Sequence, residues 1–178
     1  SVPTAKRAAP ARAGRLLVAF DRRHLHKFRT LFLPTMRRCG NHETVTAIAY
    51  GLYPSERRRL LHTPGVEAHF LPVNGIMAPR RRLRDFQPIL AAWPADTPVA
   101  CWDAGDVVFQ SSLRPLWELV AGQPDRLLAC AEPKWHPQNP AITAWTMTIR
   151  DPAHRQRAFQ QLSTRPFLNS GFCAGTAS

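Results

Sequence analysis

Two aspartates that follow a short apolar run are the residues in this sequence best suited to chemistry. Residues 99–102, Val-Ala-Cys-Trp, lie between Pro98 and Asp103, and Asp106 follows three positions later with Gly105 between the two carboxylates. Such a run is typical of a strand buried on both faces, and its C-terminal end is where open α/β sheets bind ligands. Two carboxylates at that end suit Mg or Mn, which in turn holds phosphate oxygens. A plain turn, in which Asp106 caps the next segment, is the alternative.

The segments around these aspartates alternate between strand-like and helix-like patterns. Apolar and β-branched runs predict strands over residues 15–20, 43–50, 66–71, 99–102, 126–131 and 167–174. Apolar residues spaced by three to four predict helices over residues 24–38, 54–62, 79–93, 113–120 and 153–162. Residues 143–149 fit a short strand or an insertion, and Pro34 is expected to kink or end the first helix. This order predicts an α/β fold with a mostly parallel sheet flanked by helices.

Further polar residues stand where this fold would place them near the aspartates. Asp21 closes the first predicted strand, where a carboxylate either contacts a nucleotide base or ribose or caps the next helix. Arg82 and Arg84 belong to an arginine run at the start of the predicted helix before the Asp103 strand. An arginine there is either a solvated helix end or a contact to a diphosphate, because the guanidinium fork matches phosphate oxygens.

The acidic segment resembles the Asp-x-Asp region of glycosyltransferases with the GT-A fold, in the form Asp-x-x-Asp. Residues 167–175, Phe-Leu-Asn-Ser-Gly-Phe-Cys-Ala-Gly, resemble the Asn-(Ser/Ala)-Gly strand of the family 8 galactosyl- and glycogenin-type transferases. The resemblance covers residues 14–178 and implies a Rossmann-like domain that binds a nucleotide-diphospho-sugar. Residues 1–13, rich in alanine, proline and basic residues, are expected to form a disordered tail. Since the sequence ends shortly after the second motif, we expect the donor-binding part of a transferase without its acceptor half.

The resemblance implies transfer of a sugar from a nucleotide-diphosphate donor, a uridine one, to an unknown acceptor, with Mn or Mg as cofactor. It implies that the metal is held by Asp103 and Asp106, and that the donor is contacted by Asp21, Arg82, Arg84, Asp103 and Asn169. Asp21 corresponds to the position that contacts uracil, and Asn169 would hydrogen-bond a sugar hydroxyl. Arg82 and the leucine after it resemble an Arg-Leu pair of the family, and a slightly longer spacing to Asp103 leaves Arg84 an equal candidate.

These residues lie on segments far apart in the sequence but are expected to meet. The C-terminal ends of parallel strands share one edge of a sheet. We therefore expect one cleft lined by Asp21, Asp103, Asp106 and Asn169, with one of the two arginines facing it.

The formal charge of +12 points to the main alternative, a non-enzymatic basic module that binds nucleic acid or another polyanion. The basic residues are spread along the chain without an aromatic-interleaved motif, which argues against nucleic acid. A haloacid dehalogenase type of phosphatase would need a second aspartate two positions after Asp21, where Arg23 stands.

The apolar runs and the cysteine spacing indicate the cellular compartment and the state of the cysteines. No apolar run approaches the ~18 residues of a membrane helix, so a cytoplasmic protein without a transmembrane segment is expected. The four cysteines show no Cys-x-x-Cys spacing. We expect Cys101, Cys130 and Cys173, which lie in strand-like segments, to be small buried hydrophobic residues rather than metal ligands or disulfides.

Overall fold

The computed structural model describes residues 14–73, 78–131, 140–164 and 168–177. The tail predicted over residues 1–13 lies outside these ranges. The chain divides into two compact units, one formed by Ser1–Leu128 with Gly171–Ser178 and the other by Ala129–Ser170. None of the described helices is long and apolar enough to cross a membrane.

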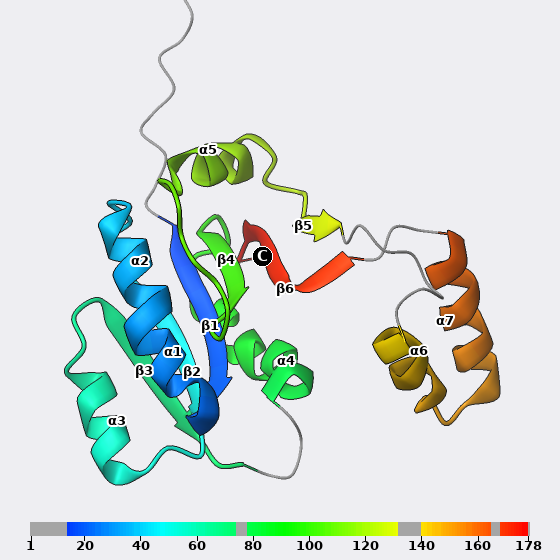
Figure 1. The fold of residues 1–178 in the computed structure, drawn as a ribbon. Coiled ribbons are helices and arrows are strands. Elements are labelled where there is room, and N and C mark those ends of the chain that lie inside the picture. Colours follow the sequence, from blue (N-terminus) through cyan, green and yellow to red (C-terminus); the bar gives the residue numbers. More distant parts are fainter. Residues whose placement is uncertain (1–13, 74–77, 132–139, 165–167, 178) are drawn as a thin grey trace, which may run out of the picture. The chain divides into compact units, whose positions relative to one another are not determined.

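A six-stranded mixed sheet forms the framework (Figure 1). Its strands are β1 (Arg15–Asp21), β2 (Val45–Tyr50), β3 (Val66–Leu71), β4 (Pro98–Asp103), β5 (Leu128–Ala131) and β6 (Leu168–Thr176). They are ordered β3-β2-β1-β4-β6-β5, and the first four of this order run parallel to one another. β6 runs antiparallel to β4. The predicted α/β fold with a mostly parallel sheet is confirmed, with each predicted strand near its expected position.

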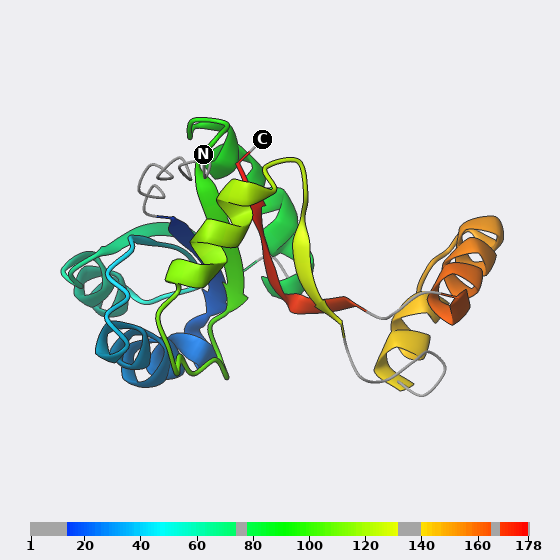
Figure 2. The same ribbon diagram turned by 90° about the horizontal axis from the view of Figure 1, so that it is seen from above.

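Helices cover both faces of the parallel strands, as Figure 2 shows. The helices of this unit are η1 (Arg22–His24), α1 (Leu25–Lys27), η2 (Phe28–Phe32), α2 (Leu33–Arg38), α3 (Pro54–Leu61), α4 (Ala78–Ala91) and α5 (Arg114–Gly122). Alternate side chains of a strand point to opposite faces. In β1, Leu16 and Val18 therefore pack with α1, α2 and α3, whereas Leu17 packs with α4.

Pro34 does not break the helical segment that follows β1. The backbone forms a π-helical turn at Phe28–Phe32, and Pro34 then occupies the first turn of α2. Proline is tolerated in a first turn, because its missing N–H would have no intrahelical partner there. The expected kink is thus replaced by a local widening that keeps Phe28 and Phe32 buried against the sheet.

The C-terminal end of α2 holds the segment that follows β4. The buried amide of Asn41 donates to the carbonyl of Ser111 at 3.0 Å and accepts from the backbone N–H of Leu113 at 2.7 Å. The N–H of Phe109 donates to the hydroxyl of Thr35 at 3.2 Å. Leaving a buried polar group unpaired costs about 1–3 kcal/mol, so these bonds fix the course of the chain just beyond the two aspartates.

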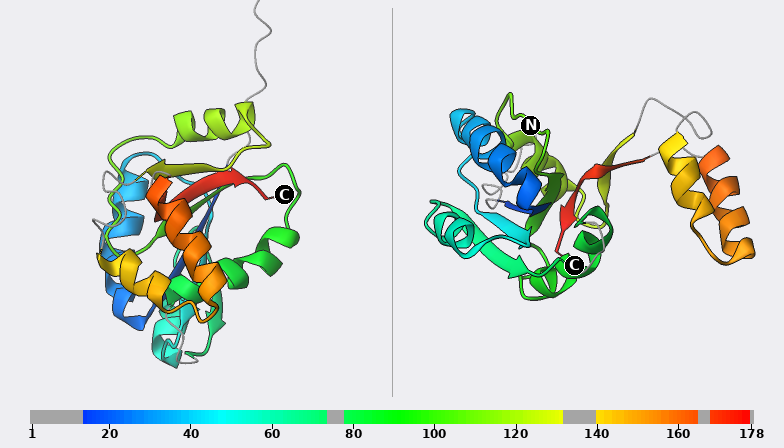
Figure 3. Two further views of the ribbon diagram at one scale, coloured as in Figure 1. Left: turned by 90° about the vertical axis from the view of Figure 1, so that its right-hand side faces the viewer. Right: turned by 60° about the horizontal axis from the view of Figure 1, so that its bottom comes forward.

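Residues Ala129–Ser170 carry two helices, α6 (Pro140–Met147) and α7 (Pro152–Thr164), which pack side by side (Figure 3). The short strand suggested for residues 143–149 is wrong. Ile142 and Thr146 are both buried one helical turn apart, and the Thr146 hydroxyl donates to the Ile142 carbonyl at 2.8 Å. The threonine thus satisfies its hydroxyl within the helix, which offsets its preference for a strand.

Two of the cysteines face each other across the antiparallel strands. Cys101 of β4 is opposite Cys173 of β6, and both are half-buried thiols. A hydrogen bond from Cys101 lowers the pKa of the Cys173 thiol to about 7. Cys130 is exposed, so the prediction of a buried residue is wrong at that position.

Candidate functional site

The acidic segment lies at the C-terminal edge of two adjacent parallel strands. The register of β1 and β4 pairs Ala19 with Asp103, so Asp21 reaches the same edge two residues later. A cleft of about 260 Å³ is present there. Its charged and titratable lining includes Asp21, His24, Lys27, Arg82, Asp103 and Asp106. Four residues singled out from the sequence, contributed by β1, α4, β4 and the loop after β4, therefore surround one space.

Of the other two candidates, Arg84 is directed away from this cleft, and the side chain of Asn169 is not among those that the structure describes. Arg84 has a side chain that is 69% exposed, beside Asp85 at 3.6 Å. Because Arg82 lines the cleft and residues two apart on a helix point in different directions, Arg84 is directed away from it. Asn169 lies near the start of β6, which runs antiparallel to β4, and therefore does not end a parallel strand. The side chain of Asn169 lies outside the described part of the chain, and its place beside Asp103 stays a prediction.

Arg82 and Asp103 form an ion pair at the base of the cleft. The Arg82 side chain is almost fully buried, whereas that of Asp103 is 44% exposed. The guanidinium thus neutralises and orients one carboxylate oxygen while the rest of the carboxylate remains accessible from the cleft.

Arg82 is held in place by its neighbours on α4. Arg81 donates to the carbonyl of Pro72 at 2.8 Å and pairs with Asp85 at 3.2 Å. Asp85 in turn accepts a hydrogen bond of 2.8 Å from the hydroxyl of Tyr50 on β2. These contacts fasten the first turns of α4 to the sheet and the loop after β3, which fixes the direction of Arg82.

Asp106 differs from Asp103 in being exposed and unpaired. Among the described residues it has neither an ion pair nor a hydrogen-bonding side-chain contact. No group of three His, Cys, Asp or Glu residues in the described ranges could by itself hold a metal ion. Two carboxylates do fit Mg or Mn bound jointly with a substrate, because such ions are usually held by one or two carboxylates together with phosphate oxygens and water.

Asp21 acts as the cap of the helical segment that follows β1. Its carboxylate accepts from the backbone N–H of Arg23 at 3.0 Å, from the Arg23 guanidinium at 2.7 Å and from Nδ1 of His24 at 2.8 Å. Burial raises the pKa of Asp21, but the hydrogen bonds and charges of Arg23 and His24 outweigh it and hold the pKa below its usual value. The helix-capping role that the sequence suggested as one alternative for Asp21 is therefore present in the structure.

The depressed pKa of Asp21 predicts a pH-dependent contribution to stability. The contribution is complete above the carboxyl pKa of the unfolded chain, about 3.9, and is lost as the pH falls through the lower pKa of the folded state. We expect Asp21→Asn to lower the free energy of unfolding by about 1 kcal/mol or less at pH ~5.5. The difference from the wild type should shrink by pH ~3 in urea unfolding. A difference that grows on acidification would contradict this account of Asp21.

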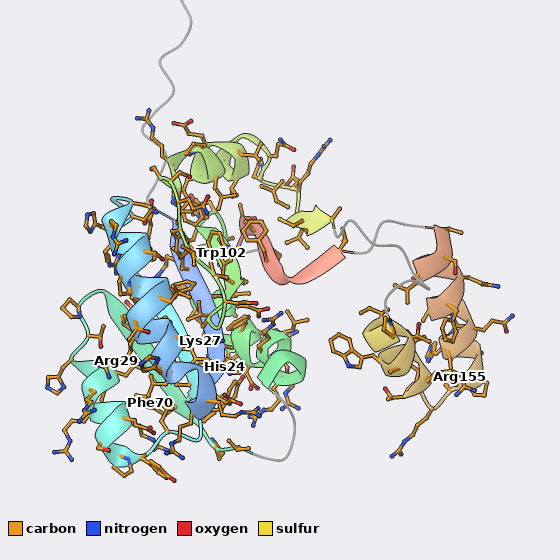
Figure 4. All side chains as sticks on the ribbon, in the orientation of Figure 1. His24, Lys27, Arg29, Phe70, Trp102 and Arg155 are labelled. Atoms are coloured by element: carbon orange, nitrogen blue, oxygen red, sulfur yellow. The ribbon has the colours of Figure 1, made fainter. Side chains whose placement is uncertain are left out.

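His24 and Lys27 are cleft residues that the sequence patterns did not single out (Figure 4). With Nδ1 engaged by Asp21, the His24 ring lies over Gly105, where an added Cβ would come within 2.8 Å of the ring. Gly105 therefore permits the close approach of the first helical segment to the acidic loop. The Asp21 to His24 spacing, three residues apart at a helix start, is the signal that could have indicated this pair.

A connected set of aromatic rings supports the strand that carries Asp103. The rings belong to Phe20, Phe28, Phe32, Phe109, Trp102 and Phe172, with neighbouring centroids 4.6–5.5 Å apart. Aromatic pairs of this geometry contribute about 0.5–1.5 kcal/mol each beyond their burial. They join β1, the helical layer, the loop after β4, β4 and β6 into one rigid support for the cleft.

This chain is similar to known proteins in structure but not detectably in sequence. No protein-family model matches the sequence, and no curated protein matches it. Among solved structures, the chain is similar to a galactosyltransferase, LgtC, in complex with donor and acceptor sugar analogs, at 14% identity and a TM-score of 0.55. It is also similar to the apo structure of a bifunctional glycosyltransferase, WbbM, at 13% identity and a TM-score of 0.60.

The similarity extends over nearly all of this chain but over only part of these proteins. It covers 92% of this chain and 58% of the LgtC chain, and 93% of this chain and 32% of the WbbM chain. The expected Rossmann-like GT-A fold is confirmed, since the six-stranded α/β architecture matches that of these glycosyltransferases.

Proposed function

We propose that this chain is the donor-binding part of a glycosyltransferase and binds a nucleotide-diphosphate sugar, a uridine one, together with Mn or Mg. The observation that carries the proposal is the convergence of Asp21, Arg82, Asp103 and Asp106 on one cleft at the C-terminal edge of β1 and β4. The glycosyltransferase fold supports the same assignment. Because the chain spans 58% of the LgtC chain, the proposal is confined to donor binding.

The charges of the cleft favour a metal and a diphosphate as a pair. Besides His24, the lining holds three carboxylates and three basic side chains, namely Asp21, Asp103, Asp106, Arg23, Lys27 and Arg82. Such a balanced set attracts neither an isolated cation nor an isolated anion strongly. A divalent cation that binds with a nucleotide diphosphate adds nearly opposite charges at once, so the pair keeps the cleft close to neutral. Metal binding should therefore depend on the nucleotide.

In this assignment Asp106 is the main metal ligand and Asp103 shares the metal or contacts the ribose. Mn or Mg, when bound, neutralises the departing diphosphate and so lowers the barrier to breaking the sugar–phosphate bond. Arg82 keeps the Asp103 carboxylate directed into the cleft and adds positive charge beside the site that a diphosphate would occupy. His24 and Lys27 also line the cleft, where they would contact the base or the phosphates.

Titration calorimetry of the wild-type chain with a panel of nucleotide sugars tests this proposal. We expect uridine-diphosphate sugars to bind in the presence of Mn and to bind much more weakly in the presence of a chelator. Guanosine- and cytidine-based sugars serve as the comparison. The proposal fails if no nucleotide sugar binds with either metal, or if binding is the same with and without metal.

A further inference from the structure

The helical layer beside the cleft carries a strong excess of positive charge. Residues 22–42 contain no aspartate or glutamate, and residues 21–62 contain nine Lys and Arg against three acidic residues. Those three acids are already engaged. Asp21 binds Arg23, Glu56 binds Arg22 at 3.1 Å, and Glu43 accepts from the indole N–H of a tryptophan.

Basic side chains on this layer point outward from one side of the sheet. The segments from α1 to α2 and α3 pack on the same face of the parallel strands, next to one another (Figures 1 and 2). We call the following exposed basic residues of these segments and of the C-cap of α3 the basic helical face: His26, Lys27, Arg29, Arg38, Arg58, Arg59 and His62. Arg57 is left out because its guanidinium donates to the Leu52 carbonyl and lies over the Phe70 ring. No residue of the basic helical face has an ion pair with an acidic residue within the described ranges.

Exposed apolar side chains accompany this charge on α3. Leu61 is 58% exposed and is the last residue of α3, next to His62. Tyr53, at the N-terminus of α3, is 54% exposed. Basic residues interspersed with a leucine and an aromatic residue are the composition of surfaces that lie in the headgroup region of a membrane.

We propose that the basic helical face binds the surface of a membrane rich in anionic lipids. Each basic residue near such a surface strengthens binding roughly fivefold, within a screening length of about 10 Å. Several such residues on one face sum to a substantial attraction, to which Leu61 adds a shallow apolar contact.

Single-stranded nucleic acid fits this face less well. Its binding sites usually combine positive charge with open aromatic rings on which bases stack. The Arg22 guanidinium covers one face of the Tyr53 ring, 3.9 Å from its centroid, so at most the other face is open to a base. No other aromatic side chain of α1 to α3 is exposed in the described chain.

The basic helical face and the cleft share Lys27. Membrane binding would thus bring the mouth of the cleft close to the lipid headgroups. The inference stands on surface charge and exposure, so it does not depend on what the cleft binds.

Vesicle co-sedimentation tests the proposal with two matched double variants. Arg58→Gln with Arg59→Gln removes two charges from the basic helical face, whereas Arg84→Gln with Arg126→Gln removes two exposed charges elsewhere. We expect the wild type to bind vesicles of mixed phosphatidylcholine and phosphatidylglycerol but not phosphatidylcholine alone, and to be released by salt. The first double variant should lose about 30-fold in binding and the second less than about threefold.

Two results would overturn the proposal. One is equal binding to vesicles with and without phosphatidylglycerol, or an equal loss in both double variants. The other is tighter binding to mixed-sequence RNA than to anionic vesicles with the same dependence on Arg58 and Arg59, which would assign the face to nucleic acid. Uridine-nucleotide titration of the same proteins separates this test from the donor proposal, since all the affected residues lie outside the cleft lining.

Discussion

We expect the replacement of Asp106 with alanine to remove metal-dependent binding of a uridine nucleotide sugar and to leave the protein folded. The Asp106 side chain is exposed and has no polar side-chain contact within the described residues, so the fold does not depend on it. Exposed substitutions of this kind usually change stability by less than about 0.5 kcal/mol. Loss of an outer-shell partner of a metal typically costs 10–100-fold in affinity, so loss of a direct ligand should cost at least about 100-fold.

The matched control for this prediction is Asp125→Ala, which removes an exposed aspartate away from the cleft lining. Calorimetric titration with Mn and the nucleotide sugar should show wild-type affinity for Asp125→Ala and none for Asp106→Ala. Asp106→Asn, which keeps the size of the side chain but not its charge, should behave like the alanine variant. Equal affinities for the wild type and Asp106→Ala would remove Asp106 from the metal site.

The second large effect is expected at Arg82, where one substitution should lower both stability and donor affinity. Arg82→Ala leaves Asp103 without its ion-pair partner and removes a buried side chain from beneath the cleft. Breaking a fully buried pair costs about 3–5 kcal/mol. Because Asp103 is 44% exposed, water replaces part of the interaction, and we expect a loss of about 1–3 kcal/mol.

Arg84→Ala is the control two residues away on the same helix, with a side chain that is largely exposed. Urea unfolding followed by tryptophan fluorescence should show a change within about 0.5 kcal/mol for Arg84→Ala. Arg82→Lys keeps the charge but loses the guanidinium fork, so it should recover part of the stability and less of the nucleotide affinity. If Arg82→Ala and Arg84→Ala are equally stable, the ion pair with Asp103 does not support the cleft.

The placement of Asp21, Asp103 and Asp106 could be predicted because the sequence shows where the buried strands end. A buried parallel strand is a continuous apolar run, and the first carboxylate after it marks where the run leaves the sheet. Helix geometry also predicts that only one of Arg82 and Arg84 faces the cleft, since residues two apart on a helix point in different directions. Which of the two arginines faces the cleft is decided by the contacts of Arg81 and Asp85, which fix the rotation of α4 about its axis.

The direction of β6 and the close approach of His24 to the acidic loop could not be predicted in the same way. The side-chain alternation of β6 is the same whichever way the strand runs, so nothing in residues 167–174 indicated pairing antiparallel to β4. The approach of His24 to the acidic loop depends on the space left by Gly105, which is a tertiary feature. The β-branched residues of 143–149 suggested a short strand or an insertion, whereas burial along one helical face decided the structure.

Joint binding of a metal and a uridine nucleotide in the cleft at the C-terminal edge of β1 and β4 can be tested directly. Paramagnetic Mn broadens the amide resonances of nearby residues, so an NMR titration locates the ion directly. We predict that Mn with uridine diphosphate broadens the amides of Asp103, Gly105 and Asp106 first and those of Asp21 and His24 next, and that Mn alone has much less effect at these positions. Broadening that is independent of the nucleotide, or that centres on residues outside this cleft, would contradict the account.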